Sequence, residues 1–279
     1  MKKQEGLVLR FLYNTVIGRG VLKIFVSPFV SKMGGFVLST RFSKIFVDRF
    51  ARKNNIDVSD YYVDDIKSFN DFFARKVKED KRPIDMVKKD FISPADGHLS
   101  FYRIDDDLVI PVKQSMFRIS TLLESEELAK KYEDGICIVI RLCVDNYHRY
   151  CYLDDGSKTN NVYIPGKLHT VRPIALANIP VFTENAREYT ILSTDNFGDV
   201  AQIEVGALMV GKIKNNHQEH DFKRGEEKGM FLFGGSTIIL LVEKNKIKIP
   251  DEYFEMTKNE QELDIKMGEK IALKYTKKN

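Results

Sequence analysis

Apolar and polar positions change their rhythm near residue 65, which divides the chain into two parts. In residues 6–50, Leu, Val, Ile and Phe are frequent, but charged residues interrupt every apolar run after at most eight positions. Between residues 38 and 50, apolar positions recur at helical spacing and basic residues lie off that stripe. The pattern predicts basic, Phe-rich amphipathic helices, broken at Gly18, Gly20, Pro28 and the pair Gly34-Gly35.

These interrupted runs set limits on how the segment meets a membrane. A spanning helix needs about 20 apolar residues, so we expect no transmembrane helix. We also expect no secretory signal, because no clean apolar region is followed by a small-residue cleavage site. The helices then suit either a membrane surface or a layer packed on the protein's own core.

From residue 91, short apolar and alternating runs are separated by turn residues, which is typical of a β-rich domain. Strands are expected at 99–104, 108–112, 136–144, 161–164, 190–192, 200–210, 213 and 238–242. Helices are expected at 120–132 and at 68–77, the latter capped by Ser68. We therefore expect an α+β protein, in which N-terminal helices (1–65) lie on a sandwich- or barrel-like β-rich core (66–279).

Charge is distributed unevenly between these two parts. Residues 1–53 carry eleven Lys or Arg against two acidic residues, a net +9, so the rest of the chain carries −5 of the total +4. This distribution predicts an anionic partner for the N-terminal segment alone. We expect no nucleic-acid partner, because no recognised binding motif is present.

Cysteine and histidine usage argues against disulfide and metal frameworks. The three cysteines, Cys137, Cys143 and Cys151, are an odd number without paired spacing, which favours reduced thiols and offers no zinc pair. His217 and His220 have ligand-like spacing in a polar run. No third ligand is near them in the sequence, so we expect a solvated loop and no metal.

Three short motifs contain residues suited to acid–base and nucleophilic chemistry. Asp96 stands at the apex of the turn Ser93-Pro-Ala-Asp-Gly97, and His148 follows the apolar strand predicted at 136–144. Ser236 follows Gly234-Gly235 at the start of another apolar strand. Each has a plain structural interpretation by itself, yet together they supply the acid, base and nucleophile of a relay.

In their order and spacing, five motifs resemble those of phosphatidylserine decarboxylase proenzymes. The resemblance covers the chain from about residue 66 through the tail. The motifs are Ser93–Gly97, Asn146–Arg149, Phe182–Arg187, Val205–Gly211 and Phe233–Thr237.

The resemblance implies a pyruvoyl enzyme made by self-cleavage between Gly235 and Ser236. The Ser236 hydroxyl attacks the Gly235 carbonyl, β-elimination frees a large chain (1–235), and position 236 becomes the pyruvoyl group of a small chain (236–279). This covalent group, with no metal and no PLP, forms a Schiff base with phosphatidylserine, which loses CO₂ to give phosphatidylethanolamine.

The resemblance also implies roles for single residues. Asp96 matches the relay acid and Ser236 the nucleophile. The family motif His-Arg-x-His here ends in Cys151, a thiol that is a poor base. Either His148 then serves both self-cleavage and decarboxylation, or His169, in Gly166-Lys-Leu-His-Thr, takes the base role. The resemblance does not identify the residues that bind the substrate phosphate; by their charge alone, Arg149, Arg187 and Lys113 are candidates.

The implied substrate gives the basic N-terminal segment a role. Lys and Arg are attracted to anionic lipid surfaces, and Phe and Leu enter the headgroup boundary. We expect a peripheral, monotopic enzyme of phospholipid biosynthesis at the cytoplasmic face of the cell membrane, and the resemblance leaves a homodimer open. The alternatives are a soluble pyruvoyl-dependent amino-acid decarboxylase and a non-catalytic lipid-binding relative.

Overall fold

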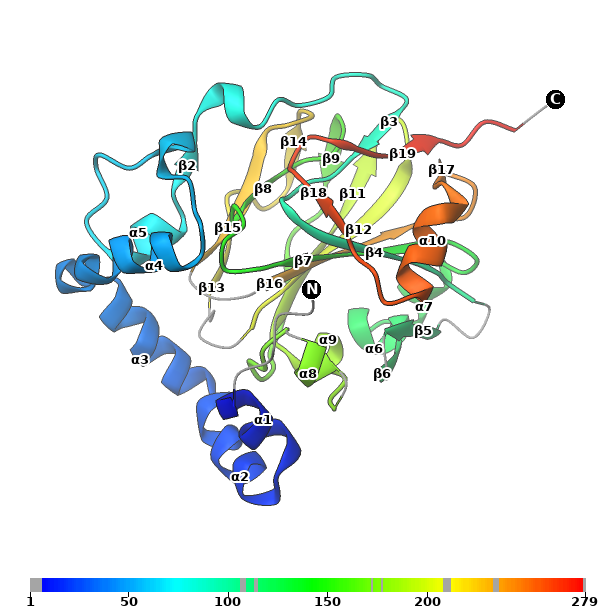
Figure 1. Ribbon diagram of the computed structural model, residues 1–279. Coiled ribbons are helices and arrows are strands. Elements are labelled where there is room, and N and C mark those ends of the chain that lie inside the picture. The colour runs from blue at the N-terminus through cyan, green and yellow to red at the C-terminus, as the bar shows by residue number, and fades with distance from the viewer. Residues whose placement is uncertain are drawn as a thin grey trace.

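The centre of the fold is a large antiparallel sheet. A computed structural model describes residues 7–105, 109–112, 115–171, 173–176, 178–207, 212–232 and 236–277. Within them, nine strands pair in the order β14-β9-β11-β12-β16-β7-β4-β18, with β10 beside β11 (Figure 1). They are β4 (Gly97–Arg103), β7 (Ile136–Leu142), β9 (Gly156–Lys158), β10 (Val162–Ile164), β11 (Arg187–Thr194), β12 (Gly198–Val205), β14 (His220–Phe222), β16 (Ser236–Val242) and β18 (Leu263–Ile265).

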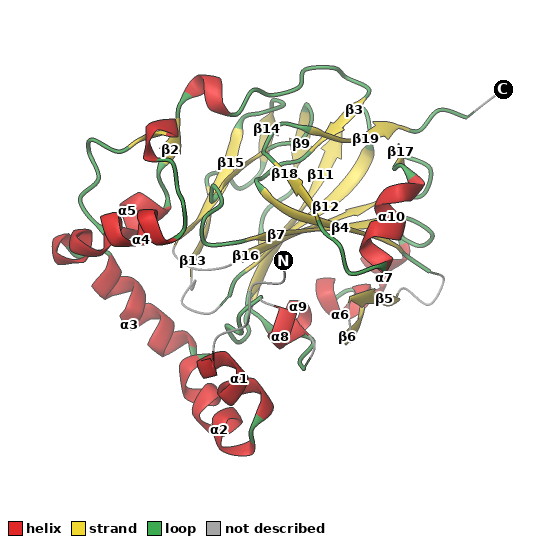
Figure 2. Ribbon diagram, viewed as in Figure 1, coloured by secondary structure: helices red, strands yellow, loops and turns green. Residues whose placement is uncertain are grey.

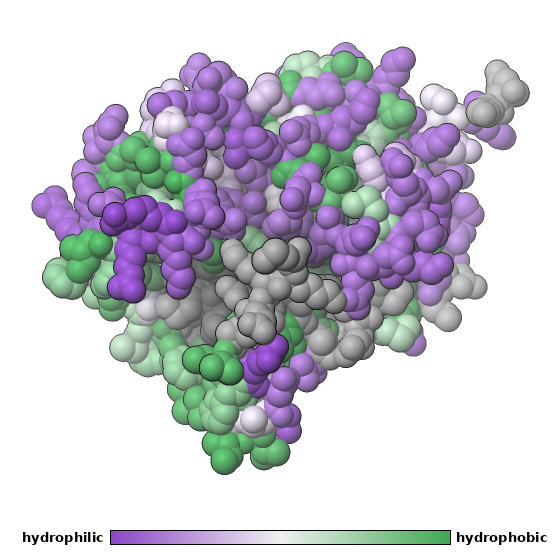
Figure 3. Space-filling model, in the orientation of Figure 1, coloured by the Kyte–Doolittle hydropathy of each residue, from purple (hydrophilic) through white to green (hydrophobic). Residues whose placement is uncertain are grey.

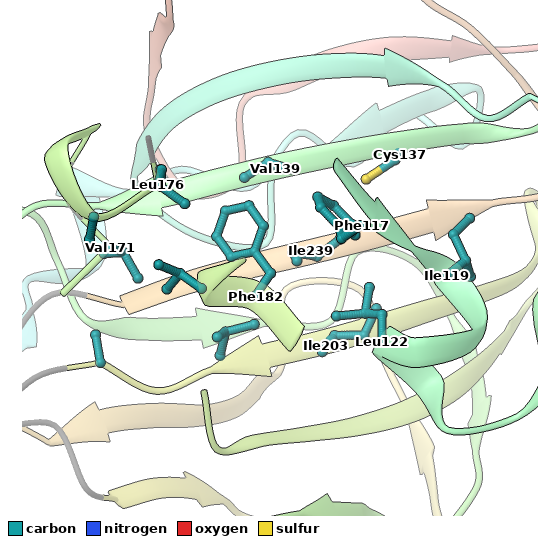
Figure 4. Close-up of a cluster of buried hydrophobic side chains, with 14 of the residues drawn as sticks. Phe117, Ile119, Leu122, Cys137, Val139, Val171, Leu176, Phe182, Ile203 and Ile239 are labelled. Carbon is teal, nitrogen blue, oxygen red and sulfur yellow. The ribbon is translucent and has the colours of Figure 1, made fainter. Parts of the chain in front are cut away.

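Strand β16 lies in the middle of this sheet, between β12 and β7, and all of its residues are buried. Its side chains alternate between the two faces of the sheet. Ile239 and Leu241 belong to a cluster that we call the helix-side core, much of which Figure 4 shows. Ile238 and Leu240 belong to the opposite cluster, which we call the sheet-side core. Burial on both faces explains the unbroken apolar run of this strand.

Different elements cover the two faces (Figure 2). The helix-side core includes residues of four short helices, α6 (Ile119–Leu123), α7 (Glu126–Lys130), α8 (Pro173–Leu176) and α9 (Val181–Glu184). The sheet-side core includes residues of two three-stranded sheets. These are β13 (Lys212–Asn215), β15 (Glu227–Leu232) and β8 (Arg149–Cys151), and β17 (Ile247–Lys248), β19 (Lys270–Lys274) and β3 (Asp90–Ile92). The arrangement confirms the predicted α+β, β-rich fold.

Smaller elements complete the body. Helix α10 (Asp251–Lys258) packs on β4, where Tyr253 stacks on Phe101 with ring centroids 5.4 Å apart. Two hairpin-like pairs are β1 (Tyr61–Tyr62) with β2 (Lys76–Val77), and β5 (Val109–Val112) with β6 (Ser115–Arg118).

The N-terminal segment forms a string of short helices that extends from the body (Figure 1). They are α1 (Leu7–Asn14), α2 (Val16–Phe25), α3 (Pro28–Leu38), the 3₁₀ helix η1 (Arg41–Phe46) and α4 (Val47–Lys53). Thr15 and Ser27 cap α2 and α3, since each hydroxyl accepts a backbone N–H of the first turn. Among the described helices, none is long and apolar enough to cross a membrane alone. The pair α2 and α3, bent by 60°, passes that test together by length and composition.

Two predicted helices are shorter than the pattern suggested. The run at 120–132 divides into α6 and α7, because Glu124 is left-handed (φ 51°) and Ser125 caps a new helix. The helix predicted at 68–77 begins at its cap, Ser68, but α5 (Phe69–Phe73) ends before β2. The helix does not continue to residue 77 because Lys76 and Val77 form strand β2, in which Val77 pairs with Tyr61 of β1.

Candidate active site

Ser236 begins the central strand and is fully buried. It lies opposite Leu142 of β7, which belongs to the sheet-side core, so its side chain faces that core. Within the described part of the chain, its hydroxyl has no hydrogen-bond partner. A buried hydroxyl without a partner is costly, which suggests that this atom has a use other than structural. Gly235 lies outside the described residues.

Asp96 reaches the same end of the sheet. Its turn leads into β4, which pairs with the far side of β7, so two strand spacings, about 10 Å, separate this turn from Ser236. Its buried carboxylate accepts two hydrogen bonds from Arg82 (2.8 and 2.6 Å) and one from the Met267 N–H (2.9 Å). These contacts fix a charged group in place.

Arg82 is a residue of this site that the sequence alone did not identify. It lies in a charged loop where nothing distinguishes it from the neighbouring lysines. Burial lowers its pKa, but the hydrogen bonds and charge of Asp96 outweigh burial and raise it overall. The guanidinium therefore stays charged beside the Asp96 carboxylate.

Cys151 lies directly against the Asp96 turn. Its N–H donates to the Pro94 carbonyl at 2.9 Å, and its side chain is buried. Burial raises the pKa of the thiol to about 12. Cys151, where the resemblance implied a second histidine, is therefore a neutral thiol at pH 7 and does not supply a base.

His148 precedes β8 and is fully buried. Its carbonyl accepts the Phe231 N–H (2.9 Å), which continues the pairing of β8 with β15, and its ring lies against Phe73 of α5, with ring centroids 4.0 Å apart. Its Nδ1 lies 2.9 Å from the Asn146 carbonyl. A carbonyl only accepts, so Nδ1 carries the proton and Nε2 is the basic nitrogen of the neutral ring.

His169 lies at the same end of the sheet but on the other side. The Asn185 side chain accepts its N–H (2.9 Å) and donates to the carbonyls of His169 (2.8 Å) and Gly206 (2.7 Å). Gly206 follows β12, beside the start of β16. The His169 ring faces Tyr13 of the helix-side core, with Nδ1 3.4 Å from the phenol oxygen. Burial lowers the pKa of this ring.

The two arginines proposed from the sequence are both engaged within the protein. Arg187 is buried and donates to the backbone carbonyls of four residues, and its pKa is lowered by burial. Those residues are Leu122, Thr183, Asn185 and Thr121. Arg149 donates to Glu227 and to the Ala74 carbonyl. Lys113 lies outside the described residues.

The fold thus places an arginine-paired carboxylate, a buried serine and two histidines on segments near one end of the main sheet, and these are the residue types of acid–base enzymes. Comparison with known proteins gives the family. The phosphatidylserine decarboxylase family model matches residues 69–273, which is more than half of the chain. The chain belongs to that family.

Curated relatives resemble the chain along nearly its whole length. The phosphatidylserine decarboxylase proenzyme 2 of Clostridium acetobutylicum is 48% identical over 272 residues, covering 97% of this chain and 93% of the relative. The proenzyme of Clostridium botulinum (strain Eklund 17B) is 39% identical, covering 95% and 92%. That of Ruminiclostridium cellulolyticum is 40% identical, covering 96% and 91%. The resemblance inferred from the five motifs is confirmed.

Proposed function

We infer that this chain is a phosphatidylserine decarboxylase, a carboxy-lyase that converts phosphatidylserine to phosphatidylethanolamine in phospholipid biosynthesis. Family membership supports the reaction. The observation that carries the assignment to a site is Ser236, a buried hydroxyl without a partner among the described residues, at the start of the central strand. The two alternatives, a soluble amino-acid decarboxylase and a non-catalytic relative, are not favoured by these matches.

We propose that the chain is a precursor that cleaves itself between Gly235 and Ser236. The Ser236 Oγ attacks the Gly235 carbonyl carbon, the hydroxyl proton passes to a base, and the amide becomes an ester. Elimination then breaks the Cβ–O bond and releases residues 1–235 with a carboxylate end. Water converts the resulting dehydroalanine to a pyruvoyl group and ammonia. Serine suits this position because elimination needs a leaving group on Cβ.

The surroundings of Ser236 fit such a group. Ser236 is buried, its side chain faces the sheet-side core, and His148 lies in the segment that follows its partner strand β7. A pyruvoyl ketone supplies an electron sink for the electrons left behind when CO₂ departs. The protein's part is to exclude water, to hold the substrate amine near position 236, and to move protons.

We propose that His148 is the base that takes the Ser236 proton and that it later returns a proton to the product. Its tautomer leaves Nε2 basic, and it lies in the segment that follows β7, whose last residue, Leu142, pairs with Ser236. Asp96 and Arg82 have a positioning role, because their ion pair anchors the turn before β4. The same turn contacts Cys151 through the Pro94 carbonyl. His169 remains the alternative base.

The cleavage proposal is tested by denaturing electrophoresis and mass spectrometry of the purified protein. We expect a large chain of residues 1–235 and a small chain of 236–279 that lacks a free amino terminus. Ser236→Ala should remain one chain. Ser236→Thr is the matched variant, since it keeps a hydroxyl on Cβ, and it should cleave slowly. A wild-type protein that stays intact, or a small chain beginning with serine, would contradict the proposal.

We further propose that the enzyme acts as a peripheral protein at the cytoplasmic face of the membrane. Residues 1–53 carry the basic excess, and much of the surface of α1–α3 that is visible in Figure 3 is apolar, with hydrophilic residues beside it. Exposed apolar residues of this segment include Leu7, Val8, Phe11, Val16, Ile17, Ile24, Phe25, Phe29, Met33, Phe36 and Val37. Together they match an anionic phospholipid surface, from which the substrate would be drawn.

A further inference from the structure

A second group of chemically active side chains lies outside the candidate active site. His217 follows β13, His220 begins β14, and Glu226 precedes β15. One ligand atom from each lies within 4.8 Å of the others. The sequence predicted a solvated loop here because no third ligand is near the histidines along the chain. The fold supplies that ligand, since the turn after β14 brings Glu226 back to them.

We propose that His217, His220 and Glu226 bind one Zn²⁺ ion, with water in the remaining position. Two imidazoles and one carboxylate are a ligand set that zinc accepts, and three protein ligands with an open position are a common arrangement. The three side chains are partly exposed, at 29%, 30% and 33%, so an ion has access from solvent. This site is independent of the pyruvoyl chemistry and goes beyond the proposed function.

Ligand distances are close to those that zinc requires. Tetrahedral zinc with bonds of 2.0–2.1 Å places its ligand atoms about 3.3 Å apart. Glu226 Oε1 lies 2.7 Å from His220 Nε2 and 3.9 Å from His217 Nε2, on either side of that value. The two rings are stacked, with centroids 3.8 Å and planes 17° apart. Binding therefore requires the rings to rotate apart so that both Nε2 atoms point at the ion.

Outer contacts already orient two of the ligands. The Tyr152 hydroxyl lies 3.2 Å from His217 Nδ1, and the Lys223 N–H donates to Glu226 Oε2 at 3.0 Å. Such contacts leave His217 Nε2 and Glu226 Oε1 for the ion, and partners of this kind usually tune metal sites. Tyr152 is itself fixed by stacking on Phe222, with ring centroids 4.2 Å apart.

The ion would connect two layers of the protein. Strand β14 is an edge strand of the main sheet, while β15 is the middle strand of the sheet that covers it. Lys158 already holds the loop between β13 and β14, since its Nζ donates to the His217 and Gln218 carbonyls (3.0 and 2.7 Å). Zinc would add a link from that loop to the start of β15, and would stabilise the folded state by mass action.

The test is a titration of ZnCl₂ into the full-length protein, purified without a histidine tag and treated with a chelator. Calorimetry should give one equivalent of Zn²⁺ per chain, and the melting temperature should rise with zinc up to about 100 µM. Co²⁺, used as a spectroscopic probe, should give the visible absorption of a tetrahedral nitrogen–oxygen site. Absence of this absorption and of zinc binding in the wild-type protein would overturn the proposal without any variant.

Variants locate the ion. His217→Gln and His220→Gln should each weaken zinc binding at least about tenfold, and Glu226→Gln should weaken it too. Glu219→Gln is the matched control. It removes a carboxylate from the same loop, but this carboxylate accepts a hydrogen bond from Asn160 and is not one of the three ligands. The zinc affinity of this variant should equal that of the wild type. Zinc affinity that is equal in the wild type and in a His217→Gln/His220→Gln double variant would place the ion elsewhere and refute this site.

Discussion

At the scale of single residues, the surroundings of His148 and His169 favour different tautomers of the neutral ring. The Asn146 carbonyl fixes the proton of His148 on Nδ1, which leaves a basic Nε2. Burial raises the pKa of Tyr13 to about 12, so this phenol is protonated, and it accepts the Thr170 N–H at 3.3 Å. The acceptor in reach of the Tyr13 proton, among the described residues, is His169 Nδ1. The proton of neutral His169 is then on Nε2, which makes it a donor.

From this difference we expect that His148→Ala slows self-cleavage by about 10²-fold or more, the usual contribution of a positioned base. His169→Ala should still cleave, because Nδ1 of the His169 ring accepts from Tyr13 and Nε2 of the neutral ring carries the proton, so neither nitrogen is available as a base. The measurement is the fraction of precursor over time on a denaturing gel, after synthesis in a cell-free system. A His148→Ala protein that matures promptly while His169→Ala stays intact would reverse the assignment and identify His169 as the base.

At the scale of elements, the N-terminal helices have an inner face that packs in the core and an outer face that is exposed to solvent. Leu12, Tyr13, Leu22 and Val26 are buried in the helix-side core, and the Val26 carbonyl accepts the Leu168 N–H at 3.1 Å. Deleting this segment would therefore damage the core beside His169 as well as remove a membrane-binding surface. Substitutions on the outer face separate these effects.

We expect the triple variant Ile17→Ser/Ile24→Ser/Phe36→Ser to lose binding to anionic vesicles without loss of folding. These side chains are 74%, 64% and 76% exposed, and transferring each into lipid is worth on the order of 1 kcal/mol, so affinity should fall about 10²-fold. Vesicle co-sedimentation measures this. Tyr163→Ser, which removes an exposed aromatic residue elsewhere (61%), is the control. Equal sedimentation of the triple variant and the control would contradict a membrane role for this face.

How much the sequence could predict depends on whether a pattern is local. Alternation and apolar runs predicted the central strands, including the one that begins at Ser236, because burial of a strand's faces is visible in its own residues. The break of the predicted helix at Glu124 could not be predicted, because nothing in the sequence marks this glutamate as having a left-handed backbone. Likewise, the contact of Arg82 with Asp96 and that of Glu226 with two histidines depend on loops that meet only in the fold.

At the scale of the whole molecule, the proposed cleavage does not free the small chain, because its first strand lies at the centre of the main sheet. Strand β16 pairs with β12 on one side and β7 on the other, and its residues fill both cores. The same 44 residues from 236 to 279 also provide β17, α10, β18 and β19. Withdrawal of this chain would break hydrogen bonds along both edges of β16 and expose a fully buried strand to water.

We therefore expect the two chains of the mature enzyme to elute together from a sizing column in native buffer, at the volume of the Ser236→Ala precursor. They should separate only in denaturant, and the transition should coincide with the loss of β-sheet circular dichroism, because removing β16 is equivalent to unfolding the core. The Ser236→Ala precursor serves as the reference for an uncut sheet. A small chain that leaves the large chain in native buffer, while the large chain keeps its sheet signal, would show that β16 is not held as the structure indicates.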